Sequence, residues 1–179
     1  MRDTLRPAVL SLLVFTVVCG FVYPFAIDAL ALVFPHDPSR LIGQPFTSPA
    51  YFWGRPSAAG YDATASAATN LGPSNDALTK QVADRIAALR AADPGNTAAV
   101  PVDLVTSSAS GLDPHISPAA AYYQVARVAR ARGVPDAAVR AVVDAHVEER
   151  TLGVLGEPRV NVVLLDRALD QRFGGSLKP

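Results

Sequence analysis

The sequence predicts an α+β protein with one N-terminal transmembrane helix followed by a single extracytoplasmic α+β domain. Three observations carry this prediction. Residues 8–27 form an apolar stretch without any charge. Apolar residues recur at helical spacing in several stretches between residues 76 and 173. Residues 100–107 are rich in β-branched side chains, which is typical of a strand, and Pro101 indicates an edge strand.

The apolar stretch is long enough to cross a bilayer. At ~1.5 Å per residue, about 20 helical residues span the ~30 Å hydrocarbon core. Arg2 and Arg6 precede the stretch, whereas acidic residues follow it. The positive-inside bias therefore predicts a cytoplasmic N-terminus over residues 1–6, a transmembrane helix with an outer extension over residues 7–34, and an extracytoplasmic domain over residues 35–179.

A cleaved signal peptide is the competing interpretation, because Ala29-Leu30-Ala31 fits an A-x-A cleavage pattern. The apolar run exceeds the ~7–15 residues of a signal core and continues to Phe34, before Pro35 stops the helix. A retained anchor is therefore favoured. Its last turns protrude from the hydrocarbon core, so either the chain's own outer domain or another subunit is expected to cover Leu30 and Val33.

Small residues within the span offer a second contact. Thr16 and Gly20 form a small-x-x-x-small pair, which permits close approach of another helix in lipid, although such pairs also arise by chance in membrane helices. Cys19 is the only cysteine, so an intrachain disulfide and a cysteine-based zinc cluster are both excluded.

The charge balance and the missing motifs exclude several classes of function. The chain carries 16 basic and 16 acidic residues, so no strong field for nucleic acid is expected. It has no Walker A loop, no dinucleotide-binding glycine motif, no H-E-x-x-H and no G-x-S-x-G. His36, His115 and His146 lie in unrelated contexts without ligand spacing. The sequence predicts neither catalytic residues nor a metal site.

Residues 35–76 are rich in turn-forming residues, with at most short strands. Within them lies an aromatic segment, residues 51–56 (YFWGRP). Trp53 and Arg55 are residue types favoured at protein interfaces, but a small domain also needs aromatic side chains in its core. Both interpretations of Trp53 stay open.

The first helix of the domain is expected after Asn75 and before Pro94-Gly95. Its apolar stripe consists of Leu78, Val82, Ile86 and Leu89. Residues 110–116 are expected to form a loop.

The next helix starts with Ser117 as cap and Pro118 as first residue, and Gly133 ends it. A basic run near its end (Arg127, Arg130 and Arg132) fits the negative end of the helix dipole.

Another helix is expected after Pro135, with four valines facing inward: Val139, Val142, Val143 and Val147. The last apolar run, residues 160–165, is either a strand or the start of a helix that Asn161 caps and that continues to Phe173. The helix is favoured.

Several separated motifs together resemble a known family. They are residues 51–57 (YFWGRPS), 70–75 (NLGPSN), 105–117 (VTSSASGLDPHIS), 124–131 (QVARVARA) and 155–169 (LGEPRVNVVLLDRAL), behind one N-terminal membrane helix. In this order they resemble the C-subunit (KdpC) family of the bacterial potassium-transporting P-type ATPase.

The resemblance implies a non-catalytic accessory subunit of an ATP-driven, high-affinity potassium uptake complex in the bacterial inner membrane. The implied partners are membrane lipid, a channel-like A subunit that passes K+, a P-type B subunit that hydrolyses ATP, and a small single-helix F subunit. ATP and K+ are then handled by the complex, and no cofactor is expected on this chain. The family's C subunit is described as a catalytic chaperone that raises the ATP affinity of the ATPase subunit.

The resemblance also links Gln124 to nucleotide contact. The predicted orientation places Gln124 outside the cell, where ATP is not available. The functional contact of the domain is therefore expected at the outer face of the channel-like subunit. The alternative is a stand-alone membrane-anchored or secreted extracytoplasmic binding protein or enzyme, which needs a self-contained polar site.

Overall fold

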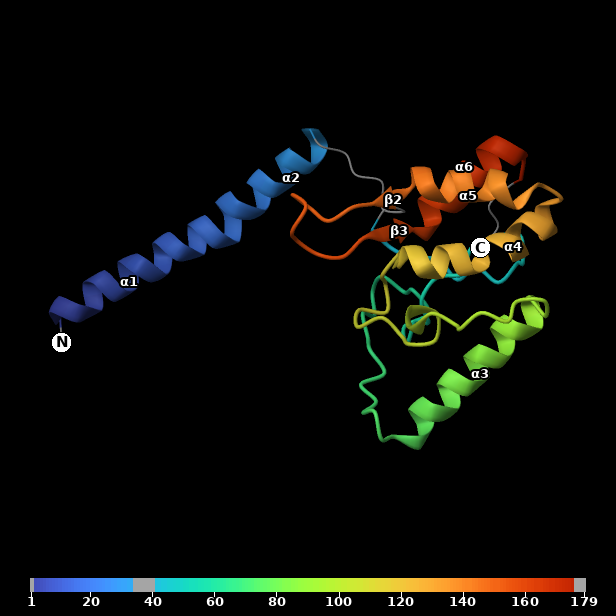
Figure 1. The fold of residues 1–179 in the computed structure, drawn as a ribbon. Coiled ribbons are helices and arrows are strands. Elements are labelled where there is room, and N and C mark those ends of the chain that lie inside the picture. The colour runs from blue at the N-terminus through green and yellow to red at the C-terminus, as the bar shows by residue number, and fades with distance from the viewer. Residues whose placement is uncertain (1, 34–40, 176–179) are drawn as a thin grey trace. The chain divides into compact units, whose positions relative to one another are not determined.

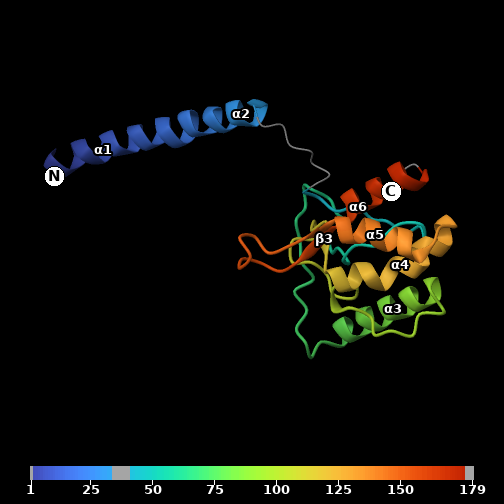
Figure 2. The same ribbon diagram turned by 45° about the horizontal axis from the view of Figure 1, so that its top comes forward.

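The computed structural model describes residues 2–33 and 41–175 of the 179-residue chain. It divides into two compact units, Met1–Asp37 and Pro38–Pro179. The described part of the first unit is one long helix, and the second unit is an α+β domain (Figures 1 and 2). The predicted fold class is confirmed.

The long helix consists of α1 (Arg2–Val17), a π-helical turn η1 (Val18–Val22) and α2 (Tyr23–Val33). It begins at Arg2 rather than at Pro7 as predicted. The π turn, in which the Tyr23 N–H donates to the Val18 carbonyl, has a local cause. Pro24 lacks the N–H that a regular α-helix would direct at the Gly20 carbonyl.

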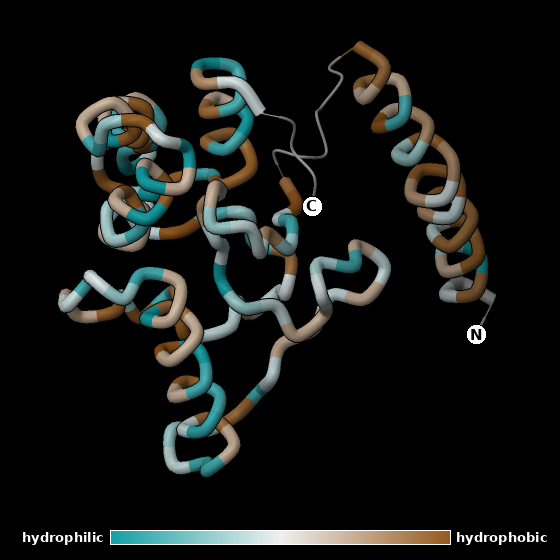
Figure 3. The backbone as a smooth tube through the Cα atoms, turned by 90° about the vertical axis from the view of Figure 1, so that its right-hand side faces the viewer, coloured by the Kyte–Doolittle hydropathy of each residue, from teal (hydrophilic) through white to brown (hydrophobic). Residues whose placement is uncertain are grey.

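The helix has the length and composition of a membrane span. The stretch Thr4–Val33 has 30 residues, its most apolar 18-residue window has a mean hydropathy of 2.3, and every side chain in the stretch is exposed. Figure 3 shows the predominance of apolar residues along it.

Four α-helices build the second unit: α3 (Asp76–Ala92), α4 (Pro118–Arg132), α5 (Asp136–Ala145) and α6 (Val162–Phe173). Their starts follow from local capping. The side chains of Asn75, Ser117 and Asn161 accept hydrogen bonds from backbone N–H groups in the first turns of α3, α4 and α6. Gly133 ends α4 with φ of 68°. The predicted helices, including the favoured helix after Asn161, are confirmed.

A small antiparallel sheet joins these helices. It consists of β1 (His115–Ile116), β2 (Val147–Glu148) and β3 (Arg159–Asn161), with β3 in the middle. Val160 lies opposite Ile116 on one side and Val147 on the other. The loop predicted over residues 110–116 therefore ends in a strand, and Val147 belongs to β2 rather than to the preceding helix.

The strand predicted over residues 100–107 is wrong. This stretch forms a short 3-10 helix, η3 (Val102–Leu104), followed by turns. The Thr106 hydroxyl donates back to the Val102 carbonyl at 2.8 Å, and the Asp103 carboxylate accepts from the Ser117 N–H at 2.6 Å. These local bonds, together with the burial of Leu104, outweigh the β propensity of the segment.

The core lies where α4, α5 and α6 pack together next to the sheet (Figure 2). Phe52, from the turn-rich segment, is fully buried within it. The apolar stripe of α3 faces the same core through Val82, Ile86 and the buried Leu89.

Candidate functional site

The aromatic segment, residues 51–56, is held by side chains of α4 and α6. The Phe52 N–H donates to the Asp166 Oδ1 atom at 2.9 Å. The Trp53 N–H donates to Gln124 Oε1 at 2.8 Å, and the Trp53 carbonyl accepts from Gln124 Nε2 at 3.1 Å. The Gln124 amide thus pairs with the Trp53 backbone as a neighbouring strand would.

Arg127 extends this anchoring. Its side chain is only 3% exposed, and its guanidinium donates to the Pro49 carbonyl at 2.7 Å, the Tyr51 carbonyl at 3.0 Å and Gln124 Oε1 at 2.6 Å. It also lies 4.5 Å from the centre of the Trp53 ring, in cation–π contact. Burial lowers the pKa of Arg127 to about 10, so it remains a cation at neutral pH.

Arg132 binds the residue just before the aromatic segment. Its Nε donates to the Ala50 carbonyl at 2.7 Å, and its guanidinium pairs with Asp170 at 2.8 Å. Asp170 in turn accepts from the Tyr51 hydroxyl at 3.1 Å. Arg130 and Arg132 lie in the last turn of α4, as the dipole interpretation expects, but Arg127 and Arg132 also bind backbone carbonyls of a distant loop, which the sequence did not indicate.

Gln124 is only 1% exposed and is saturated with hydrogen bonds. Its oxygen accepts from the Trp53 N–H and from Arg127, and its nitrogen donates to the carbonyls of Trp53 and Ala120. An amide side chain has two donors and two acceptor positions, so all four are used inside the domain. In this geometry Gln124 positions the aromatic segment.

Asp166 completes the anchoring from α6 and is fully buried. Burial raises its pKa well above the usual range, against the opposing effects of the Phe52 N–H and of Arg132 and Arg127. Its Oδ2 atom has no hydrogen-bond partner among the described residues. The sequence contained one sign of this role, because Asp166 interrupts an apolar run.

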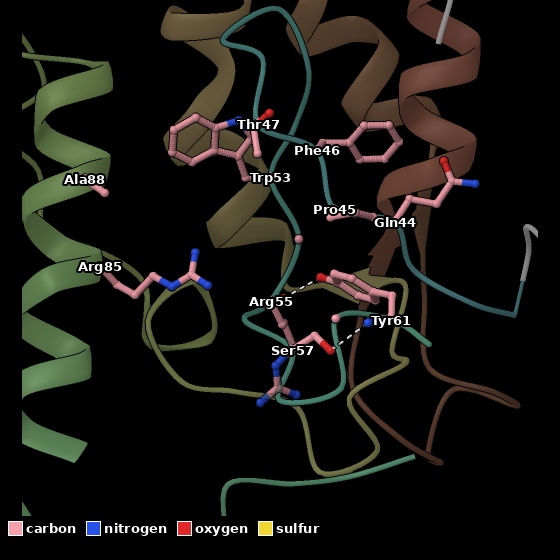
Figure 4. A pocket seen from close by; sticks show the side chains of 12 residues that line it. Gln44, Pro45, Phe46, Thr47, Trp53, Arg55, Ser57, Tyr61, Arg85 and Ala88 are labelled. Atoms are coloured by element: carbon pink, nitrogen blue, oxygen red, sulfur yellow. Dashed lines mark hydrogen bonds between the residues drawn. The ribbon is translucent and has the colours of Figure 1, made fainter. Parts of the chain in front are cut away.

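A pocket of about 390 Å³ opens beside the aromatic segment (Figure 4). Trp53 is half-buried at its edge, and Arg85 of α3 extends into the same space. The Tyr61 hydroxyl donates to the Arg55 carbonyl at 2.5 Å. A Cβ atom on Gly54 would lie 2.9 Å from that hydroxyl, so a larger residue at position 54 would have to displace the Tyr61 hydroxyl. The lining residues are Gln44, Pro45, Phe46, Thr47, Trp53, Gly54, Arg55, Ser57, Gly60, Tyr61, Arg85 and Ala88.

Arg55 joins the aromatic segment to a second loop. Its guanidinium donates to the Ser107 carbonyl at 3.2 Å and lies 3.6 Å from an Asp113 oxygen. Burial favours the neutral form of Asp113, but hydrogen bonds from the side chain and backbone of His115 and the charge of Arg55 outweigh it and lower the Asp113 pKa. These contacts of Arg55 therefore hold the two loops of the domain together.

The other sequence-predicted residues lie in the first unit. The Thr16 hydroxyl donates to the Leu12 carbonyl at 2.8 Å, and Gly20 lies in the π turn. Leu30 and Val33 are 52% and 69% exposed. The structure thus connects Gln124 directly with Trp53, whereas the four helix positions belong to a separate surface that no described residue covers.

Among residues 2–33 and 41–175, no group of three or more His, Cys, Asp or Glu side chains is placed to hold a metal ion. His115 Nδ1 lies 3.1 Å from Asp113, and His146 Nδ1 lies 2.8 Å from the Val142 carbonyl. His36 lies outside the described residues.

The fold and site together define a protein with a membrane-length N-terminal helix and one α+β domain whose buried polar side chains hold the aromatic segment, residues 51–56, in place. The family model of KdpC, the c chain of the K+-transporting ATPase, matches residues 5–171. The chain belongs to the KdpC family.

Full-length relatives agree with this assignment. The chain is 56% identical to the "Potassium-transporting ATPase KdpC subunit" of Sorangium cellulosum, over 95% of this chain and 98% of that protein. It is 54% identical to the protein of the same name from Polaromonas naphthalenivorans, over 100% of this chain and 97% of that protein. The protein of that name from Janthinobacterium sp. is 53% identical, over 96% of this chain and 100% of the relative.

Membership fixes the kind of activity. A KdpC protein is a non-catalytic subunit of a potassium-transporting ATPase, and the other subunits of that complex are its partners. The resemblance noted from the sequence motifs is confirmed, and the stand-alone enzyme or binding protein is wrong.

Proposed function

We propose that the chain is an extracytoplasmic accessory subunit that docks on the outer face of the channel-like subunit and supports ATP-coupled K+ import by stabilising the assembled complex. One observation carries the proposal. A membrane-length helix with every side chain from Thr4 to Val33 exposed is followed by a domain in which the buried Gln124 and Arg127 side chains bind the domain's own backbone. Such a chain offers surfaces for contact.

The charge distribution supports the orientation. Arg2 and Arg6 lie before the uncharged stretch, residues 8–27, and Asp28 is the first charged residue after it. The positive-inside bias keeps the arginine-bearing end in the cytoplasm and places the domain outside. The P-type B subunit then hydrolyses ATP on the opposite side of the membrane from the domain.

The contact surface of the helix is proposed to include two places. Thr16 and Gly20 pack against a helix of another subunit, because small side chains allow close approach in lipid. Leu30 and Val33, near the outer end of α2, lie against the channel-like subunit and hold the domain at its surface. The small F subunit completes the same membrane assembly.

The four hydrogen bonds of Gln124 bear on the family account of nucleotide affinity. Direct contact with ATP requires the Gln124 amide to leave its partners on Trp53, Ala120 and Arg127. A contribution to ATP affinity of the complex is therefore proposed to pass through assembly, with Gln124 acting as a positioning residue for the aromatic segment.

The test is co-expression of the tagged full chain with the A, B and F subunits, followed by purification in mild detergent and by protease treatment of intact spheroplasts. We expect the A, B and F subunits to co-purify with the tagged chain. The domain should be digested from outside without lysis. Digestion only after lysis would reverse the orientation and restore direct ATP contact at Gln124.

A further inference from the structure

The hairpin between β2 and β3 ends in an exposed apolar tip. The hairpin tip, defined as residues 150–157, projects from the domain in Figure 1. Leu152, Val154 and Leu155 are 87%, 72% and 59% exposed. Leu152 and Val154 are more exposed than any other large apolar side chain described in the outer domain. Contiguous exposed apolar residues of this kind mark interaction sites.

The hairpin tip is held in one shape by its own bonds. Thr151 and Leu155 exchange both backbone hydrogen bonds, at 2.9 and 3.0 Å. An ion pair between Arg150 and Glu157, at 2.6 Å, closes the base of the tip. A second pair between Arg159 and Glu148, at 3.0 Å, bridges β3 and β2. A preordered loop loses little conformational freedom when it binds.

Leu152 has a backbone conformation that favours glycine. Its φ is 56°, in the left-handed region, which a branched apolar side chain adopts less readily than glycine does. With 87% of the residue exposed, packing inside the domain does not offset that cost. We therefore expect the Leu152 side chain to contact a surface outside the domain.

Charge identifies the kind of surface that receives the tip. The flanking positions carry three acidic residues and two arginines: Glu148, Glu149, Arg150, Glu157 and Arg159. Both arginines are already paired with glutamates. Anionic lipid headgroups attract clusters of free basic residues, so these positions do not favour a lipid surface. An apolar pocket on a protein fits the tip better.

The short connection between the membrane-length helix and the domain limits which proteins the hairpin tip can reach. Only residues 34–40 separate Val33, at the end of the membrane-length helix, from Leu41 at the start of the described domain. A chain of that length reaches at most about 29 Å even when fully extended. Proteins embedded in the same patch of membrane are therefore always within the domain's reach.

We propose that the hairpin tip inserts Leu152, Val154 and Leu155 into an apolar pocket on the extracytoplasmic face of the channel-like subunit. This inference rests on the proposed function and names a specific contact within it. The tip acts as a preformed anchor, and the surrounding charged residues stay at the rim of the contact, where they remain solvated.

The key variant is Leu152→Gly in the full chain, co-expressed with the other subunits. Glycine suits φ of 56°, so the unfolding midpoint of the domain should stay the same or rise. Recovery of the complex in detergent should nevertheless fall, reflecting an affinity about tenfold or more lower, because a buried leucine is lost from the contact. A purely structural role of Leu152 predicts a lowered midpoint, which would overturn the proposal.

A matched pair of valines gives the control. Val154 and Val102 are 72% and 69% exposed, and only Val154 belongs to the hairpin tip. Val154→Ser should weaken complex recovery several-fold, whereas Val102→Ser should leave it unchanged. Equal recovery of both variants and of the unmodified chain would overturn the contact.

A photo-crosslinking residue at position 154 identifies the occupant. Crosslinks to the channel-like subunit support the proposal, whereas crosslinks only to a different subunit, to lipid or to a second copy of this chain overturn it. If the unmodified chain does not co-purify with the transporter at all, the proposed function has failed. If it co-purifies and the tip variants do so equally well, only the present inference has failed.

Discussion

The two units of the chain treat their side chains in opposite ways. From Thr4 to Val33 every side chain is exposed, and the Thr16 hydroxyl bonds within its own turn of helix. In the second unit, by contrast, polar side chains such as Gln124, Arg127 and Asp166 are almost completely buried and bonded to a distant loop. The apolar side chains of the first unit can be covered only by lipid or a partner, whereas these polar side chains of the second unit find their hydrogen-bond partners within the domain.

This difference separates two kinds of mutational effect. Changes to the buried polar side chains should alter the stability of the domain, whether or not the complex is present. Changes to the exposed helix should alter assembly and leave the domain folded. The sole tryptophan, Trp53, lies in the anchored segment, so its fluorescence reports unfolding of the second unit specifically.

The largest effect is expected from Arg127→Met. Methionine fills part of the volume but leaves the carbonyls of Pro49 and Tyr51 without their buried donor. Breaking such a buried charged network costs about 3–5 kcal/mol. Urea unfolding of the full chain in detergent, followed by Trp53 fluorescence, measures this loss.

The matched control is Arg90→Met, at an exposed position in the last turn of α3. It should change the unfolding free energy by less than about 0.5 kcal/mol. If Arg127→Met is equally mild, the aromatic segment is held by its apolar contacts, and the contrast between the two units disappears.

The next effect concerns the other unit. Replacing Leu30 and Val33 together by serine should lower the stability of the complex by ~2–4 kcal/mol if both side chains are fully buried against a partner. The Trp53 unfolding transition should stay unchanged, because neither residue belongs to the domain. Recovery of the other subunits with the tagged chain measures the effect, and full recovery would reject this contact.

The helices were predictable because their determinants are local. Asn75, Ser117 and Asn161 cap the helices that follow them, and Gly133 ends α4 in the left-handed conformation that glycine favours. Apolar spacing supplied the buried faces. The length of the apolar N-terminal run likewise predicted the membrane-length helix.

The anchored segment was not predictable because its partners are distant in the sequence. Gln124 and Trp53 are 71 positions apart, and Phe52 and Asp166 are 114 apart. Strands of two or three residues carry no useful periodicity, so the sheet around Val160 was missed. The failed strand at residues 100–107 has the converse cause, since local side-chain bonds replaced a β propensity that only long-range pairing could have satisfied.

The smallest predicted effect is a change in how the unfolding free energy of the second unit depends on pH. It tests whether the Asp166 carboxyl is kept from water inside the domain. Burial raises the pKa of Asp166 well above 3.8 in the folded domain, despite the nearby charges of Arg127 and Arg132. A raised folded-state pKa contributes stability that is fully present below pH 3.8 and is lost as pH rises through the folded-state pKa.

Asp166→Asn keeps an oxygen for the Phe52 N–H but removes the ionisation. The unfolding free energy of the variant, minus that of the unmodified chain, should therefore increase as pH rises from 4 to 8. Taking this difference cancels groups with the opposite trend, such as Asp113, whose pKa is lowered. Asp136→Asn, at an exposed carboxylate in the first turn of α5, controls for simple loss of a negative charge. A difference that stays constant across this range would mean that Asp166 ionises as readily in the folded domain as in the unfolded chain, and that water or a cation reaches it there.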